Sequence, residues 1–174
     1  MATISAHGIQ ASLPQGFEGR IFVRPRTGAE LTYPVAQFAT FALPSAVGDF
    51  GSGAVTLMGS SDVFVTLFEY GPESLGTRLF ARQGMPRDLA PADFRPTVLR
   101  RGIPGQSGTQ WFFTEGGRPF TLYVVLGSHA LRASLVPRVN GLLRAVALDA
   151  VTAPAAGAEA GSPVAATSLP ARWN

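Results

Sequence analysis

The stretch GDFGSGAV, residues 48–55, contains the Asp-Phe-Gly triplet with which kinases hold magnesium, set in a glycine-rich segment. A kinase also needs a lysine for the ATP phosphates and a His-Arg-Asp loop, and a P-loop needs its own lysine. The chain contains no lysine and no such tripeptide. These absences exclude both nucleotide sites, and the dinucleotide-binding fingerprint is incomplete because its third glycine is missing.

One binding hypothesis for this stretch survives. Backbone N–H groups that precede a helix can hold an anion without any lysine. If a short helix begins here, the candidate anion loop consists of Gly48, Gly51, Ser52 and Gly53. The competing interpretation is a glycine-rich connecting loop that holds no ligand.

Residues for metal binding and covalent catalysis are sparse. The chain has no cysteine and only two histidines, His7 and His129, so a three-histidine zinc site is impossible. Each histidine is expected in a turn or at the surface. The sequence GQSGT, residues 105–109, comes near the Gly-x-Ser-x-Gly nucleophile elbow, but threonine replaces the last glycine and the motif precedes a strand. We therefore predict no catalytic residue, no cofactor and no metal.

Glu69 is the one carboxylate with two competing interpretations. It ends the apolar segment 62–71, on the same strand face as Val63 and Leu67. The carboxylate can interact with the N-terminal amides of a helix that starts at Pro72. Alternatively, it is a buried acid with a raised pKa beside a pocket, as an enzyme would use.

Charge and length limit the classes of partner. All 14 basic residues are arginines, against 11 acidic residues, so the net charge is +3. This small charge, with most aromatic residues on predicted strands, argues against nucleic-acid binding. No apolar run approaches a membrane span, and the N-terminus lacks the features of a secretory signal. We therefore expect a cytoplasmic protein without a membrane span.

The C-terminal part differs in composition from the rest. Residues 152–174 are rich in Ala, Pro, Gly and Ser and cannot bury a core. We expect a globular domain over residues 1–151, followed by this flexible low-complexity tail. The tail ends in a candidate docking segment, 168–174, whose Leu169, Arg172 and Trp173 are residue types that anchor protein interfaces. A disordered end is the alternative.

The elements that must position these residues are mostly strands. The segment 62–71 is apolar on both faces, which is typical of a central strand. Gly116 and Gly117 predict a tight hairpin turn within TQWFFTEGGRPFTLYVVLGS, residues 109–128. The other predicted strands are 8–13 and 20–24, which flank a turn at 14–16, and 33–44.

Three helices are predicted. A short one is capped by Ser52 and runs to Met58, and another starts at Pro72 and ends before Gly84. In the second helix Leu75, Leu79 and Phe80 should face the core. The third helix is capped by Ser134 and should pack on the sheet through an apolar stripe formed by Val136, Val139, Leu142, Leu143 and Val146.

A chain of 174 residues, 46% of them apolar and 14% charged, can form one domain with a substantial core. The order of its elements over residues 5–149 resembles the PsbP-type α+β architecture, a single domain with an antiparallel sheet covered by helices. HGIQASLPQGFEGRI, residues 7–21, is similar to that family's opening strand, Pro-Gly-aromatic turn and second strand, with Phe17 where tryptophan is common. The chain is also similar to actinobacterial proteins without an assigned activity. The resemblance implies a non-enzyme and transfers no site residues.

Three functions follow from these observations. The leading one is a non-enzymatic accessory or adaptor subunit, which binds a protein partner or forms a homo-oligomer through its sheet edge or its tail. The first alternative is a small-ligand or anion-binding domain that uses the loop 48–53. The second alternative is an enzyme with a carboxylate site near Glu69.

Overall fold

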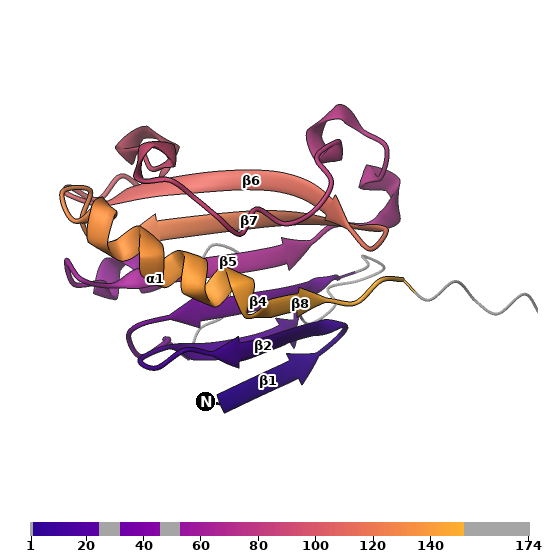
Figure 1. The fold of residues 1–174 in the computed structure, drawn as a ribbon, viewed down its shortest axis with the longest axis horizontal. Coiled ribbons are helices and arrows are strands. Elements are labelled where there is room, and N and C mark those ends of the chain that lie inside the picture. Colours follow the sequence, from indigo (N-terminus) through magenta and orange to yellow (C-terminus); the bar gives the residue numbers. More distant parts are fainter. Residues whose placement is uncertain (1, 25–31, 46–52, 152–174) are drawn as a thin grey trace, which may run out of the picture.

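The computed structural model of the chain describes residues 2–24, 32–45 and 53–151. This part contains two antiparallel sheets and one α-helix, which confirms an α+β fold (Figure 1). Its strands are β1 Ala2–Ala6, β2 Ile9–Leu13, β3 Glu18–Val23, β4 Pro34–Ala39, β5 Val63–Glu69, β6 Ser107–Glu115, β7 Arg118–Leu126 and β8 Val146–Leu148. The helix is α1 Arg132–Arg144, and the 3-10 turns are η1 Ala54–Leu57, η2 Pro72–Ser74, η3 Arg78–Phe80, η4 Pro91–Asp93 and η5 Pro96–Val98.

The large sheet has the strand order β3-β4-β5-β7-β6. β5 lies at its centre, between β4 and β7, and all of its residues before Glu69 are buried, as its apolar sequence predicted. β6 and β7 form the predicted hairpin. Gly116 and Gly117 make its turn at φ +60° and +76°, the left-handed conformation that glycine adopts without strain.

A three-stranded sheet, β1-β2-β8, was not predicted. β1 and β2 form a hairpin around His7 and Gly8, and β8 pairs with the other side of β2. The turn at residues 14–16 is confirmed by the hydrogen bond from Phe17 N to Pro14 O at 3.1 Å. However, β2 and β3 on either side of this turn belong to different sheets.

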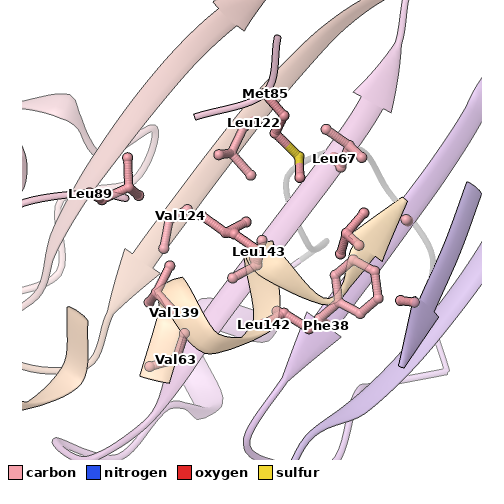
Figure 2. Close-up of a cluster of buried hydrophobic side chains, with 14 of the residues drawn as sticks. Phe38, Val63, Leu67, Met85, Leu89, Leu122, Val124, Val139, Leu142 and Leu143 are labelled. Atoms are coloured by element: carbon pink, nitrogen blue, oxygen red, sulfur yellow. The ribbon is translucent and has the colours of Figure 1, made fainter. Parts of the chain in front are cut away.

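The main core lies between the large sheet and a layer formed by α1 and the small sheet. Val139, Leu142 and Leu143 of α1 pack against β-strand residues such as Val63 and Val124 (Figure 2). Ile9, Ala11 and Leu13 of β2 enter the same cluster. The covering layer therefore consists of one helix and a second sheet, whereas several helices were expected. We call the covered side of the large sheet its helix face.

The boundaries of α1 differ from those predicted. The helix starts at Arg132, after Leu131, so Ser134 lies inside its first turn and its hydroxyl donates to Leu131 O at 2.9 Å. Pro137 lies in the second turn, and its side chain is exposed. The predicted stripe is buried throughout, but Val146 belongs to β8, because the helix has already ended at Arg144.

The helix predicted between Pro72 and Gly84 is wrong. The segment forms two separate 3-10 turns, η2 and η3, because Gly76 adopts a φ of +75° that ends any helical run between them. Leu75 and Leu79 are 37% and 56% exposed, against the prediction that they face the core, whereas Phe80 is buried as predicted.

Candidate functional site

Most residues of two predicted sites lie outside the described residues. Gly53 alone is described, and it precedes η1, a 3-10 turn in the region of the predicted short helix, at φ +86°. The whole segment 152–174 lies outside the described residues. The site residues that are not described are Gly48, Gly51, Ser52, Leu169, Arg172 and Trp173. The anion loop and the docking segment therefore stay predictions.

Glu69 is paired with an arginine. Its two carboxylate oxygens accept hydrogen bonds from Nε and Nη2 of Arg118 at 3.0 and 2.6 Å. Glu69 lies opposite Phe120 in the ladder between β5 and β7, and Arg118 precedes Phe120 by two residues on the same face. Neither interpretation of Glu69 included this partner.

Arg118 also joins the two sheets. Its Nη1 donates to Gly8 O at 2.8 Å and its Nη2 to His7 O at 2.9 Å, so it fixes the turn between β1 and β2. Nη1 also donates to Asp149 O at 3.2 Å, just after β8. A Cβ at Gly8 would lie 2.7 Å from Nη1, and Gly8 has a φ of +71°, so a larger residue would displace the guanidinium and strain the backbone. The pair of Arg118 and Glu69 is therefore a structural link between elements.

The two histidines lie in different connections of the fold. His7 is exposed in the β1–β2 turn, and His129 is half-buried between β7 and α1. Ser107, from GQSGT, is buried at the start of β6, and within the described residues its Oγ has no hydrogen-bond partner, so no Ser–His pair forms. In residues 2–24, 32–45 and 53–151, no group of three or more His, Asp or Glu could hold a metal ion. No helix in the same ranges has the length and apolar character needed to cross a membrane.

The outer edge of β6 is the feature that best fits a binding site. Near the end of β6, Thr114 N donates to Arg82 O at 2.8 Å, and Thr114 O accepts from Gly84 N at 2.8 Å. Near its start, Gly108 exchanges two hydrogen bonds with Arg95, at 2.9 and 3.1 Å. Figure 1 shows the corresponding coils at the two ends of β6. The edge is thus closed at both ends by other parts of the chain.

Between these two points the edge of β6 is open. Glu115 and Arg118 flank a two-residue turn, so they form a hydrogen-bonded pair between β6 and β7. Hydrogen-bonded and non-hydrogen-bonded pairs alternate along an antiparallel ladder. The N–H and C=O of Thr114, and of every second residue before it in β6, therefore point away from β7. Gln110 and Phe112 are the outward-pointing residues between Thr114 and Gly108. Their four backbone groups have no hydrogen-bond partner within the described part of the chain. We call residues 110–112 the open segment.

A pocket adjoins the open segment on the helix face. It has a volume of about 300 Å³ and is lined by residues 85–89 together with Arg82, Asp93 and Trp111. The Arg82 guanidinium lies over the indole ring, with its carbon 5.1 Å from the ring centroid. Trp111 Nε1 is buried and has no acceptor within the described residues. We call this cavity the Trp111 pocket.

The charges around the Trp111 pocket are engaged, with one exception. Arg87 pairs with Glu115 at 3.1 Å, Arg144 hydrogen-bonds Asp88, and Asp93 accepts from Ala90 N at 2.8 Å. Arg82 is exposed, and within the described ranges its guanidinium makes no hydrogen bond or ion pair. This guanidinium is therefore available to a ligand.

The opposite face of the open segment is aromatic. Phe112 packs edge-on against Phe80, with ring centroids 5.7 Å apart, and Phe80 contacts Tyr70 at 5.1 Å. These rings cover the sheet at the Thr114 end of the open segment. Leu79, which is 56% exposed, belongs to the same 3-10 turn as Phe80. Apolar side chains on this face would find exposed apolar neighbours.

A buried polar row on this opposite face ends at the open segment. The strand register places Arg20, Gln37, Thr66, Tyr123 and Gln110 side by side across all five strands. Burial lowers the pKa of Arg20, which donates to Gln37 Oε1 at 3.0 and 2.6 Å. Burial also raises the pKa of Tyr123, although its hydroxyl accepts a hydrogen bond from Arg100 N at 3.0 Å. Gln110 Nε2, at the edge, has no acceptor within the described residues.

Sequence reasoning missed Arg82, Gln110, Trp111 and Phe112 as a site. The aromatic residues were predicted to lie on strands, and Arg82 falls within the helix predicted between Pro72 and Gly84. The position of the hairpin turn does allow one prediction: the second residue before Gly116, and every second residue before that, has its backbone N–H and C=O directed away from β7. The closing contacts use backbone groups of Arg82, Gly84 and Arg95, which every residue type carries, so the open segment itself could not be located.

Comparison of the chain with protein-family models, with curated proteins and with solved structures finds no match. The likeness to the PsbP-type architecture therefore stays a prediction from element order. A function has to be argued from the geometry of the open segment and the Trp111 pocket.

Proposed function

We propose that this protein is a non-enzymatic binding subunit that takes up an extended segment of a protein partner along the open segment of β6. The observation that carries the proposal is the unpaired backbone of Gln110 and Phe112 between two closed ends. An extended peptide that adds to a sheet edge gains affinity from main-chain hydrogen bonds and specificity from pockets for alternate side chains. The open segment and the Trp111 pocket supply both.

The dimensions favour a short segment. Gly108 and Thr114 are six residues apart, or about 20 Å along a strand. Arg95 and the Arg82–Gly84 stretch occupy the two ends, so the room between them fits about three to five extended residues. Four backbone hydrogen bonds to Gln110 and Phe112 would each contribute about 0.5–1.5 kcal/mol net. This is the range of a moderate, reversible interaction.

Two further points support a binding role over catalysis. The carboxylate of Glu69, the candidate for an enzyme, is occupied by Arg118. The predicted likeness to PsbP-type proteins implies an accessory or binding protein. On this proposal the partner is a protein with an accessible extended segment.

A library of random seven-residue peptides displayed on phage tests the proposal. We expect selected peptides to shift the backbone amide NMR signals of Gln110 and Phe112. Gln110→Pro should weaken their binding at least about tenfold, because proline removes one outward N–H and fills the edge without breaking the ladder to β7. The proposal is wrong if the library yields no binder, or if the binders are insensitive to Gln110→Pro.

The small sheet provides a matched control. β1 is also an edge strand, and Ser5 is one of its outward-pointing residues, since Ala6 and Ile9 flank a two-residue turn. Ser5→Pro makes the same change on an edge that lacks the Trp111 pocket, since the cavity near β1 is lined by Ala2 and residues 13–17 and not by Ser5. It should leave peptide binding unchanged.

A further inference from the structure

The Trp111 pocket identifies the chemistry of the bound segment. In a strand pair, residues directly opposite each other project their side chains to the same face of the sheet. A peptide residue opposite Trp111 therefore points to the helix face, beside the indole ring and the Arg82 guanidinium. The residues before and after it would lie beside Phe112 and Gln110 on the opposite face. One side chain of the partner thus faces the pocket.

The groups of the Trp111 pocket without a hydrogen-bond partner are donors. Arg82 carries a full positive charge that no carboxylate or carbonyl within the described residues satisfies, and Trp111 Nε1–H is buried without an acceptor. An indole nitrogen can only donate, and a guanidinium can only donate. The missing partner of both is an acceptor, and a negative charge suits Arg82 best.

The acidic residues near the pocket do not fill this role. Asp88 is hydrogen-bonded to Arg144, Glu115 is paired with Arg87 and also accepts from Met85 N at 2.7 Å, and Asp93 accepts from Ala90 N. Each of these carboxylates is held by another group, and within the described residues none of them hydrogen-bonds or pairs with Arg82. Stacking on Trp111 also holds the guanidinium in place before any ligand arrives, which reduces the ordering cost of binding.

We infer that the segment bound at β6 carries a glutamate or aspartate opposite Trp111, whose carboxylate is bound by Arg82 and by Trp111 Nε1–H. This inference rests on the proposed function. A pocket of about 300 Å³ has room for a carboxylate side chain. The flanking residues of the segment would be apolar on the Phe112 side.

The peptides selected from the phage library test the inference directly. We expect them to contain an acidic residue, and its replacement by the matching amide to weaken binding about three- to tenfold. In Arg82→Gln most of the difference in affinity between the acidic and the amide peptides should be lost. Raising the salt concentration from 50 to 500 mM should reduce the acidic preference, because the ion pair is partly exposed.

Two variants separate a local effect from a general one. Arg78→Gln removes an exposed arginine one turn earlier and should leave the acidic preference intact. Trp111→Phe keeps an aromatic ring but removes the indole N–H, and it should reduce the preference only in part. If peptides bind at β6 without an acidic preference, or if the preference survives Arg82→Gln, the inference is wrong while the proposed function stands. If no peptide binds, both are wrong.

Discussion

Arg118 and Arg82 each lie over an aromatic ring on the helix face of the large sheet, yet the two sites differ in every other respect. The guanidinium carbon Cζ of Arg118 is 4.9 Å from the centroid of the Phe120 ring, and Cζ of Arg82 is 5.1 Å from the centroid of the Trp111 ring. Arg118 is 7% exposed and makes five hydrogen bonds, two of them to Glu69. The Arg82 side chain is exposed, and its guanidinium makes none within the described residues.

The difference separates a folding role from a binding role. A buried guanidinium is tolerated only when its N–H groups are satisfied and its charge is paired. Arg118 meets this condition with a carboxylate and three carbonyl oxygens from distant parts of the chain. Arg82 pays no such desolvation cost and keeps its hydrogen-bonding capacity for a ligand. Replacement of each arginine should therefore change different measured quantities.

The largest effect is expected for Arg118→Ala. The variant leaves the Glu69 carboxylate, whose side chain is only 13% exposed, without a partner and releases the carbonyl oxygens of His7 and Gly8, so the free energy of unfolding should fall by about 3–5 kcal/mol. Urea denaturation measures this value. Glu69→Gln is the control, because its amide oxygen still accepts from Arg118, and it should cost less. A loss below about 1 kcal/mol in Arg118→Ala would contradict the structural role.

A moderate effect is expected at Tyr123, the neighbour of the open segment in the buried polar row. Tyr123→Phe removes the acceptor for Arg100 N, so the free energy of unfolding near neutral pH should fall by about 1 kcal/mol. A clearly smaller fall in the free energy of unfolding would mean that this hydrogen bond of the polar row does not stabilise the fold.

The same residue predicts a pH dependence. Burial raises the pKa of Tyr123 above its ordinary value of 10.0, so the unfolded chain loses this proton at a lower pH than the folded chain. The contribution of Tyr123 is therefore complete below pH 10 and is lost as the pH rises through the folded pKa. Denaturation series from pH 8 to 11 should show a flatter alkaline decline in Tyr123→Phe. An unchanged decline would contradict this assignment.

The parts of the fold that the sequence predicts have strong local signals. β5 is apolar on both faces, and Gly116 and Gly117 determine the hairpin. The missed strands lack such signals: β1 is a run of small residues without clear alternation, and β8 has three residues directly after α1. Residues 72–84 have a helical spacing of leucines, but the positive φ of Gly76 overrides it.

The candidate site depends on contacts between distant segments, which explains why it was not predicted. The alternation of β6 shows that Gln110 and Phe112 point outward, but the strand order decides that β6 lies at an edge. Arg82 and Arg95 then close the ends of that edge through backbone groups, which every residue type carries. Neither fact has a local sequence signature.

The smallest effect on stability is expected for Arg82→Gln. The variant loses one exposed stacking contact with Trp111 and leaves the backbone bond from Thr114 N to residue 82 in place, so the free energy of unfolding should change by about 0.5 kcal/mol. Urea denaturation beside Arg78→Gln, another exposed arginine, provides the comparison. A loss above about 2 kcal/mol would place Arg82 with Arg118 among the structural arginines. A small loss of stability means that the fold does not depend on the Arg82 guanidinium. Its hydrogen-bonding groups are then available to a partner.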